Sequence, residues 1–61
     1  MITTAYAPEA DAFHLRLAPK GRAIAETREV APGVLLDIDP SGQVVAIEVL
    51  GVRARTAAAA T

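Results

Sequence analysis

Histidine is the side chain best suited to acid–base chemistry near neutral pH, and the chain has a single one, His14. It lies in an alternating run in which Phe13 and Leu15 point to the opposite face of a strand. A general base acts on a nucleophile within hydrogen-bond reach, and no serine or cysteine lies near His14 in the sequence. We therefore interpret His14 as a surface or packing residue, and we keep a minor enzyme that uses His14 as an alternative.

Two aspartates, Asp37 and Asp39, lie two residues apart and share one face of a predicted strand. The rise of a strand puts their Cα atoms about 7 Å apart. Together with a third oxygen ligand, this spacing suits a hard cation such as Mg²⁺ or Ca²⁺. The simpler interpretation is that Asp39 opens a turn and Asp37 keeps an exposed face polar. We therefore predict no metal site.

Another pair of carboxylates, Glu9 and Asp11, flanks the first predicted turn. A catalytic carboxylate pair needs one acid whose pKa is raised by burial, and the tip of a turn does not bury it. Aspartate in a turn instead accepts hydrogen bonds from the local backbone. We predict a structural role for both residues.

The remaining charged residues of interest are predicted to lie on strands. Glu26, Arg28 and Glu29 would form cross-strand charge pairs or protect a sheet edge from aggregation, and a strand that docks a partner is the alternative. Glu48 interrupts an otherwise apolar strand. It either pairs with Arg16 or Arg28 or marks a contact between subunits.

The sequence has no phosphate-binding glycine loop, no nucleophile elbow and no cluster of metal ligands. We therefore predict no catalytic residues, no cofactor and no metal. The net charge of −1 and the presence of only two aromatic residues argue against nucleic acid as a partner. The first ten residues lack the pattern of a secretion signal, and no apolar stretch is long enough to span a bilayer. We expect a cytoplasmic protein that makes no membrane contact.

A chain of 61 residues forms one domain and buries only about 60% of the surface that its unfolded form exposes. Such small domains are usually stabilised by disulfides, by a metal, by oligomerisation or by unusually tight packing. With no cysteine and one histidine, disulfides and the usual zinc site are excluded. Oligomerisation or tight packing remains.

The elements that must position these residues are short. Five segments have the composition or alternation of strands: residues 2–6, 12–17, 23–30, 34–39 and 44–50. Turn signals separate them: residues 8–11, residues 18–21, Pro32-Gly33 and Asp39-Pro40-Ser41-Gly42. Residues 23–30 would make only about two turns of a helix, which is marginal in water, so we predict a polar edge strand. Residues 52–61 are predicted to form a short helix or a disordered tail.

Alternation of side chains fixes the register of the last two strands. A loop with an even number of residues places Asp39 opposite Val44, whereas a three-residue loop is closed by Asp39 and Gln43. We predict the even loop, because it gathers six large apolar residues on one face. They pair as Ile38 with Val45, Leu36 with Ile47, and Val34 with Val49. One thin sheet cannot hide such a face together with the apolar residues on its other side.

The predicted fold is therefore mainly β, a small antiparallel β-meander of about four to five strands whose sheets pack across a homodimer. Residues 1–51 form the single domain, and residues 52–61 form the tail or short helix. The predicted interface consists of Val34, Leu36, Ile38, Val45, Ile47 and Val49.

Three stretches of the chain match a family pattern in order. They are residues 6–17 (YAPEADAFHLRL), residues 25–37 (AETREVAPGVLLD), and the turn DPSG at 39–42 leading to IEVL at 47–50. Over residues 6–50 the chain resembles domain-of-unknown-function (DUF) family 2283, small prokaryotic proteins with the pattern Tyr-Asp-Pro-Glu-Ala-Asp-Ala, Glu-Thr-x-Glu, Pro-Gly-Val, Asp-x-x-Gly and Ile-Glu-Ile-Leu. Ala7 replaces the aspartate of that pattern, and His14 stands where tyrosine is common. The resemblance implies a compact antiparallel sheet and no assigned activity. Some family members are thought to be encoded near small toxin-like proteins.

These observations favour a non-enzymatic structural or protein-interaction role as a homodimer. An antitoxin-like module that binds a partner protein through an exposed sheet edge is the alternative that the resemblance supports.

Overall fold

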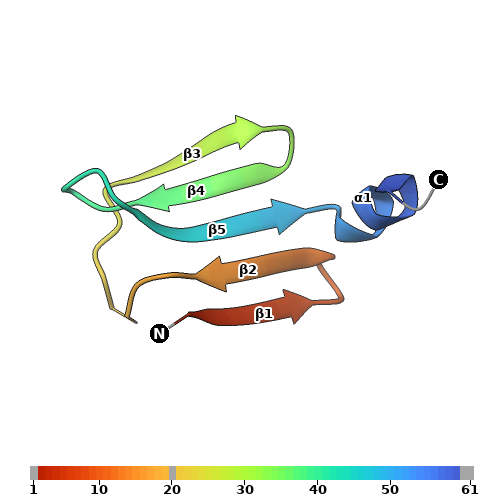
Figure 1. Cartoon of the computed structure of the whole chain (residues 1–61), viewed down its shortest axis with the longest axis horizontal. Coiled ribbons are helices and arrows are strands. Elements are labelled where there is room, and N and C mark those ends of the chain that lie inside the picture. Colours follow the sequence, from red (N-terminus) through yellow and green to blue (C-terminus); the bar gives the residue numbers. More distant parts are fainter. Residues whose placement is uncertain (1, 20, 60–61) are drawn as a thin grey trace.

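The computed structural model describes residues 2–19 and 21–59 and is a single open sheet followed by a helix (Figure 1). The strands are β1 (Thr3–Ala7), β2 (Ala12–Arg16), β3 (Glu26–Ala31), β4 (Val34–Ile38) and β5 (Val44–Leu50), and the helix is α1 (Val52–Ala59). All strand pairs are antiparallel. The mainly β prediction is confirmed, and the C-terminal segment is a helix over its described part. Met1 and Lys20, which belong to the predicted domain, and residues 60 and 61 of the predicted tail lie outside the described residues.

The strand order is β1-β2-β5-β4-β3. Strands β3, β4 and β5 form a three-stranded meander, and the β1–β2 hairpin joins it through the pairing of β2 with β5. The chain reaches β3 from β2 by a connection at one end of the sheet, the left end in Figure 1. Strands β1 and β3 are consequently the two edges.

The third strand confirms the predicted polar edge but begins later than predicted. It starts at Glu26, and all six of its residues are exposed. Just before it, the Ala25 N–H donates to the Ile38 carbonyl at 2.8 Å, but residues 23–25 are not part of the strand. A register shift between Glu29 and Ala31 leaves Val30 unpaired in a β-bulge, where 51% of it is exposed.

The β4–β5 hairpin differs from the predicted even loop. The Asp39 N–H donates to the Gln43 carbonyl, and the Gly42 N–H donates to the Asp39 carbonyl, both at 2.9 Å. The loop therefore has three residues, and Gly42 accepts the φ of 90° that it requires.

Leu36 nevertheless faces Ile47 and Val34 faces Val49, as predicted. The reason is a register shift beside Ile38, which pairs with Val44 and leaves Val45 as the extra residue. The predicted pairing of Ile38 with Val45 is wrong, because the bulge offsets the odd loop.

Residues directly opposite one another on antiparallel strands share a face of the sheet. The register therefore defines an apolar face that consists of Thr4, Tyr6, Phe13, Leu15, Val34, Leu36, Ile38, Val44, Ile47 and Val49, with Glu26, Arg28 and Ala31 of β3 at its margin. The opposite, polar face consists of Thr3, Ala5, Ala7, Ala12, His14, Arg16, Thr27, Glu29, Leu35, Asp37, Ala46, Glu48 and Leu50. Helix α1 continues past the end of β5 and covers neither face (Figure 1).

Candidate interaction surface

The apolar face is not covered by a second layer of strands or by α1 within the described residues. Among the described residues, the buried hydrophobic ones are Ala12, Ala18, Val45 and Ala46, so Val45 is the only one of them larger than alanine. The side chains of β4, and those of residues 47–49 of β5, are only partly buried. Tyr6 and Val44, at the margins of the face, are exposed by 41% and 38%. One layer of strands therefore does not enclose a core.

The overall dimensions agree with an unfinished core. The surface of 4227 Å² exceeds the about 3,700 Å² expected for a folded monomer of 6.3 kDa. The radius of gyration is 12.5 Å, against about 10.5 Å for a compact domain of this length. With principal-axis extents of 39 × 21 × 18 Å, the molecule is more elongated and more exposed than a compact domain of this length.

Five of the six predicted interface residues lie together on the apolar face: Val34, Leu36, Ile38, Ile47 and Val49. Val45 is different, because it is 1% exposed and so is already covered within one chain. Its carbonyl accepts the N–H groups of Leu17 and Ala18, at 2.8 and 3.2 Å. Sequence reasoning missed Phe13 and Leu15 as members of this surface. They lie on β2, which is distant from β5 in the sequence but pairs with it in the sheet.

The two margins of the apolar face differ in charge. At the β3 margin, the Arg28 guanidinium donates to both carboxylate oxygens of Glu26, at 3.0 and 3.1 Å. This hydrogen bond and the negative charge of Glu26 raise the pKa of Arg28. At the β1 margin, the face ends in uncharged Thr4 and Tyr6. The predicted cross-strand charge pair is thus a pair along one strand.

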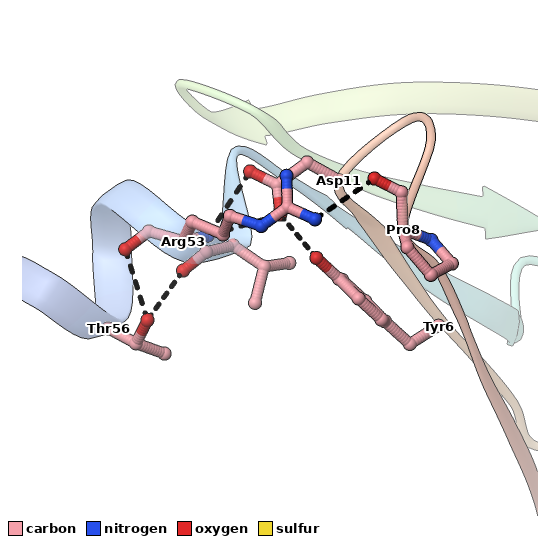
Figure 2. A network of polar contacts seen from close by, with 6 residues as sticks. Tyr6, Pro8, Asp11, Arg53 and Thr56 are labelled. Carbon is pink, nitrogen blue, oxygen red and sulfur yellow. Dashed lines mark hydrogen bonds and ion pairs between the residues drawn. The ribbon is translucent and has the colours of Figure 1, made fainter.

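A polar network anchors α1 to the first hairpin (Figure 2). The Asp11 carboxylate accepts the Tyr6 hydroxyl at 2.7 Å and the Arg53 backbone N–H at 3.2 Å. The Tyr6 hydroxyl, with help from the N–H and charge of Arg53, lowers the pKa of Asp11, and the same hydrogen bond raises the pKa of Tyr6. Asp11 has a φ of 51°, which aspartate tolerates in a turn. A carboxylate at the first turn of a helix satisfies unpaired N–H groups there and favours the helix dipole.

Two arginines of α1 extend this anchor to both hairpins. The Arg53 guanidinium donates to the Pro8 carbonyl at 3.2 Å. The Arg55 guanidinium donates to the Leu50 carbonyl at 2.9 Å and to the Pro32 carbonyl. Gly33 leaves room for this contact, because a Cβ on it would lie 2.6 Å from Arg55 Nη2.

Asp39 organises the β4–β5 turn, as predicted. It is 4% exposed, and its Oδ1 accepts the Ser41 N–H, the Ser41 hydroxyl and the Gln43 N–H at 2.7 to 3.0 Å. The Gln43 N–H and the Ser41 hydroxyl are the main causes that lower the pKa of Asp39. Its Oδ2 lies 3.4 Å from Arg22 Nη2. All of its oxygens are therefore committed to the local fold.

The other candidate residues lie on the polar face. Asp37 accepts the Thr27 hydroxyl at 2.8 Å, so Asp37 and Asp39 have separate partners. No group of three potential metal-ligating side chains occurs in the part of the chain that the structure describes. His14 lies directly opposite Glu48 on β5, and no hydrogen bond joins them within residues 2–19 and 21–59. Glu48 shares this face with Arg16, whereas Arg28 belongs to the opposite one.

The comparisons with known proteins give one result. The family model described as a protein of unknown function, DUF2283, matches residues 4–53. The chain belongs to the DUF2283 family. No curated protein and no solved structure matches the chain. Within the described residues, no helix is long and apolar enough to cross a membrane.

Part of the DUF2283 pattern lies at the turns of this chain. Tyr6, Pro8 and Asp11 surround Arg53 (Figure 2). The carbonyl of Pro32 accepts a hydrogen bond from Arg55. Asp39 forms the remaining patterned turn. The turn residues of the pattern thus hold the hairpins and α1 in place, whereas its residues 26–29 and 47–50 lie on β3 and β5.

Proposed function

We propose that this DUF2283 protein is a non-enzymatic protein-interaction module that acts as a homodimer, with the apolar face as its dimer interface. The observation that carries the proposal is that Val45 is the only large hydrophobic side chain buried among the described residues. A second copy of the same face would provide the missing layer, as in a two-sheet sandwich.

The size of the apolar face suits a dimer. Strands of five residues and about 4.8 Å spacing give the five-stranded sheet a face of about 17 by 20 Å. Two such faces cover about 700 Å² in projection, and the accessible surface of their side chains is larger. That area approaches the roughly 1,000 Å² that a stable interface requires.

Charge also favours a second copy as the occupant. The centre of the face, formed by Leu15, Ile47 and Leu36 in one row, is uncharged. The Glu26–Arg28 pair at the margin is neutral as a unit and stays accessible to water at the rim. Two copies can therefore meet without burying an unpaired charge.

A charge at the centre of the face tests the proposal. Ile47→Asp replaces a residue in the middle row of the apolar face, whereas Leu50→Asp, a matched control on the same strand, lies on the polar face. Losing the burial of one isoleucine removes about 2–5 kcal/mol, which is comparable with the whole stability of about 3–9 kcal/mol for 61 residues. We expect Ile47→Asp to be unfolded by circular dichroism, and Leu50→Asp to stay folded and to keep the mass of the unmodified assembly by light scattering.

If Ile47→Asp remained a folded dimer, the apolar face would not be the dimer interface. A milder variant, Ile47→Ala, separates folding from assembly, because it creates a cavity without a charge. It is expected to shift dissociation to higher protein concentration while the remaining dimer keeps its sheet signal.

A further inference from the structure

The two edges of the sheet are protected to different degrees. An edge strand exposes unpaired N–H and C=O groups that accept another strand, and proteins block such edges with charges, prolines and bulges. Strand β3 has these devices: Glu26, Arg28 and Glu29 are charged, and a bulge leaves Val30 out of register.

Strand β1 has none of them. Its sequence, Thr-Thr-Ala-Tyr-Ala, contains no charge and no proline, and its register with β2 is continuous. Rows of residues that pair from one strand to the next across the sheet show how the two edges differ. The row that ends in Glu29 on β3 ends in Ala5 on β1, and the row that ends in Arg28 ends in Thr4. Thr3 to Tyr6 are exposed.

We infer that the edge of β1 pairs with the edge of β1 in a second copy, in antiparallel orientation. This inference rests on the proposed dimer, which it extends to four copies. An antiparallel pair centred on Ala5 places Thr4 opposite the partner's Tyr6 and Thr3 opposite the partner's Ala7. An aromatic residue opposite a β-branched one is a favourable cross-strand pair, and no like charges meet. The strand is thus complementary to itself.

The position of Tyr6 supports this pairing. Its hydroxyl is bound to Asp11, which fixes the side chain, while 41% of the residue remains exposed at the edge (Figure 2). Little side-chain freedom would be lost when the partner's Thr4 packs against the ring.

The edge contact is compatible with the proposed face contact. Thr4 and Tyr6 continue two rows of the apolar face to the edge, so edge pairing joins two apolar faces into one. The two-fold axis of an antiparallel edge pair is perpendicular to the sheet, whereas the axis of two stacked sheets lies between them. If the axis between the stacked sheets runs across the strands, it meets the perpendicular axis at the edge of β1. Two perpendicular two-fold axes that intersect close an assembly at four copies, the common symmetry of tetramers.

The experiment compares two glutamate variants of the full chain on the two edge strands. Ala5→Glu puts a charge on β1, and Val30→Glu puts the same charge on β3, at an exposed position that the bulge leaves unpaired. By sedimentation equilibrium, we expect four copies for the unmodified chain and for Val30→Glu, and two copies for Ala5→Glu. By amide hydrogen exchange, outward N–H groups of β1 are expected to be protected in the unmodified chain and exposed in Ala5→Glu.

The outcomes separate the edge contact from the face contact. A dimer that Ala5→Glu leaves intact, with rapidly exchanging β1 amides, would overturn the edge pairing and keep the proposed dimer. A dimer that Ala5→Glu converts into monomers would support the edge pairing and overturn the face contact. If Ala5→Glu does not fold, Thr3→Glu tests the same edge, because its carboxylate would lie opposite Arg16 on β2.

Discussion

Arg53 and Arg55 are two residues apart, yet they bind different hairpins. Arg53 binds the carbonyl of Pro8 in the β1–β2 turn, and Arg55 binds the carbonyl of Pro32 in the β3–β4 turn. One turn of α1 therefore connects two hairpins that have only β5 between them in the sheet.

The contact between Gly33 and Arg55 predicts an energetic coupling. Gly33 and Gly42 have φ values of 74° and 90°, so alanine at either position is strained by about 1–2 kcal/mol. At Gly42 a Cβ meets nothing within 4 Å, whereas at Gly33 it would displace the Arg55 guanidinium. Gly33→Ala is therefore expected to lower the free energy of unfolding more than Gly42→Ala, as measured by urea denaturation.

A double-mutant cycle with Arg55→Ala checks the cause of this difference. With Arg55 truncated, the two glycine substitutions are expected to destabilise the protein equally. If Gly33→Ala still lowered the free energy of unfolding more than Gly42→Ala in the Arg55→Ala background, contact with Arg55 would not be the cause of the difference.

Asp39 predicts a pH dependence of stability. Its pKa is lowered in the folded state, so its contribution is complete above the unfolded pKa of about 4 and is lost as the pH falls through the folded pKa. Asparagine at position 39 takes up no proton. The free energy of unfolding of Asp39→Asn is therefore expected to fall less steeply below pH 4, because its unfolding takes up as much as one proton fewer. Urea titrations between pH 2 and 7 measure the slope, and equal slopes for the two proteins would contradict the assignment.

Asp11 acts in the same direction, because its pKa is also lowered. Asp11→Asn in the Asp39→Asn background is expected to flatten the acid limb further.

The sequence indicated correctly which residues work within a turn. Asp39 could be predicted because its partners lie two and four residues away, inside a recognisable Asp-Pro-Ser-Gly turn. The link from Asp11 to Arg53 spans 42 residues and depends on β5 lying beside β2. No local spacing signals such a contact, and only the structure places it.

The β4–β5 hairpin has a loop of a different length from the predicted one, and yet most of the predicted apolar residues share a face. A three-residue loop alone would put Ile47 and Leu36 on opposite faces. The bulge at Val45 adds one residue to β5 and restores their pairing. Alternation of apolar residues therefore predicts which side chains share a face, but it does not predict the loop length or the bulge that brings them there.

Helix α1 has no apolar stripe and eight residues, so it depends on its anchor. Isolated helices of this length are marginal in water, and Asp11 binds its first turn. Asp11→Gly removes the carboxylate without straining the φ of 51°. We expect the helical Cα chemical shifts of Val52–Ala59 to fall to mostly coil values while the shifts of β4 and β5 stay extended.

Glu9→Gly, in the same turn, is the control and should leave α1 intact. If α1 kept its helical shifts in Asp11→Gly, the carboxylate would not be what holds the helix.

For the whole molecule, composition left oligomerisation or tight packing as the expected means of stabilisation, and oligomerisation stays a prediction. A chain with no cysteine, two aromatic residues and many alanines builds a sheet without a second layer. The strand order could not be predicted. The turns of the sequence predict which consecutive strands form hairpins, but they do not indicate that β2 pairs with β5 rather than with β3. That order nevertheless determines the width of the apolar face.

The central claim is that this face is covered by a second copy, and the mass of the folded protein tests it most directly. Sedimentation equilibrium at micromolar concentration, beside a circular dichroism spectrum of the same sample, measures assembly and folding together. The predicted result is a β-rich protein with twice the 6.3 kDa mass of one chain, or four times that mass with the edge pairing, and no folded single chains. A β-rich, cooperatively melting species of 6.3 kDa would contradict it.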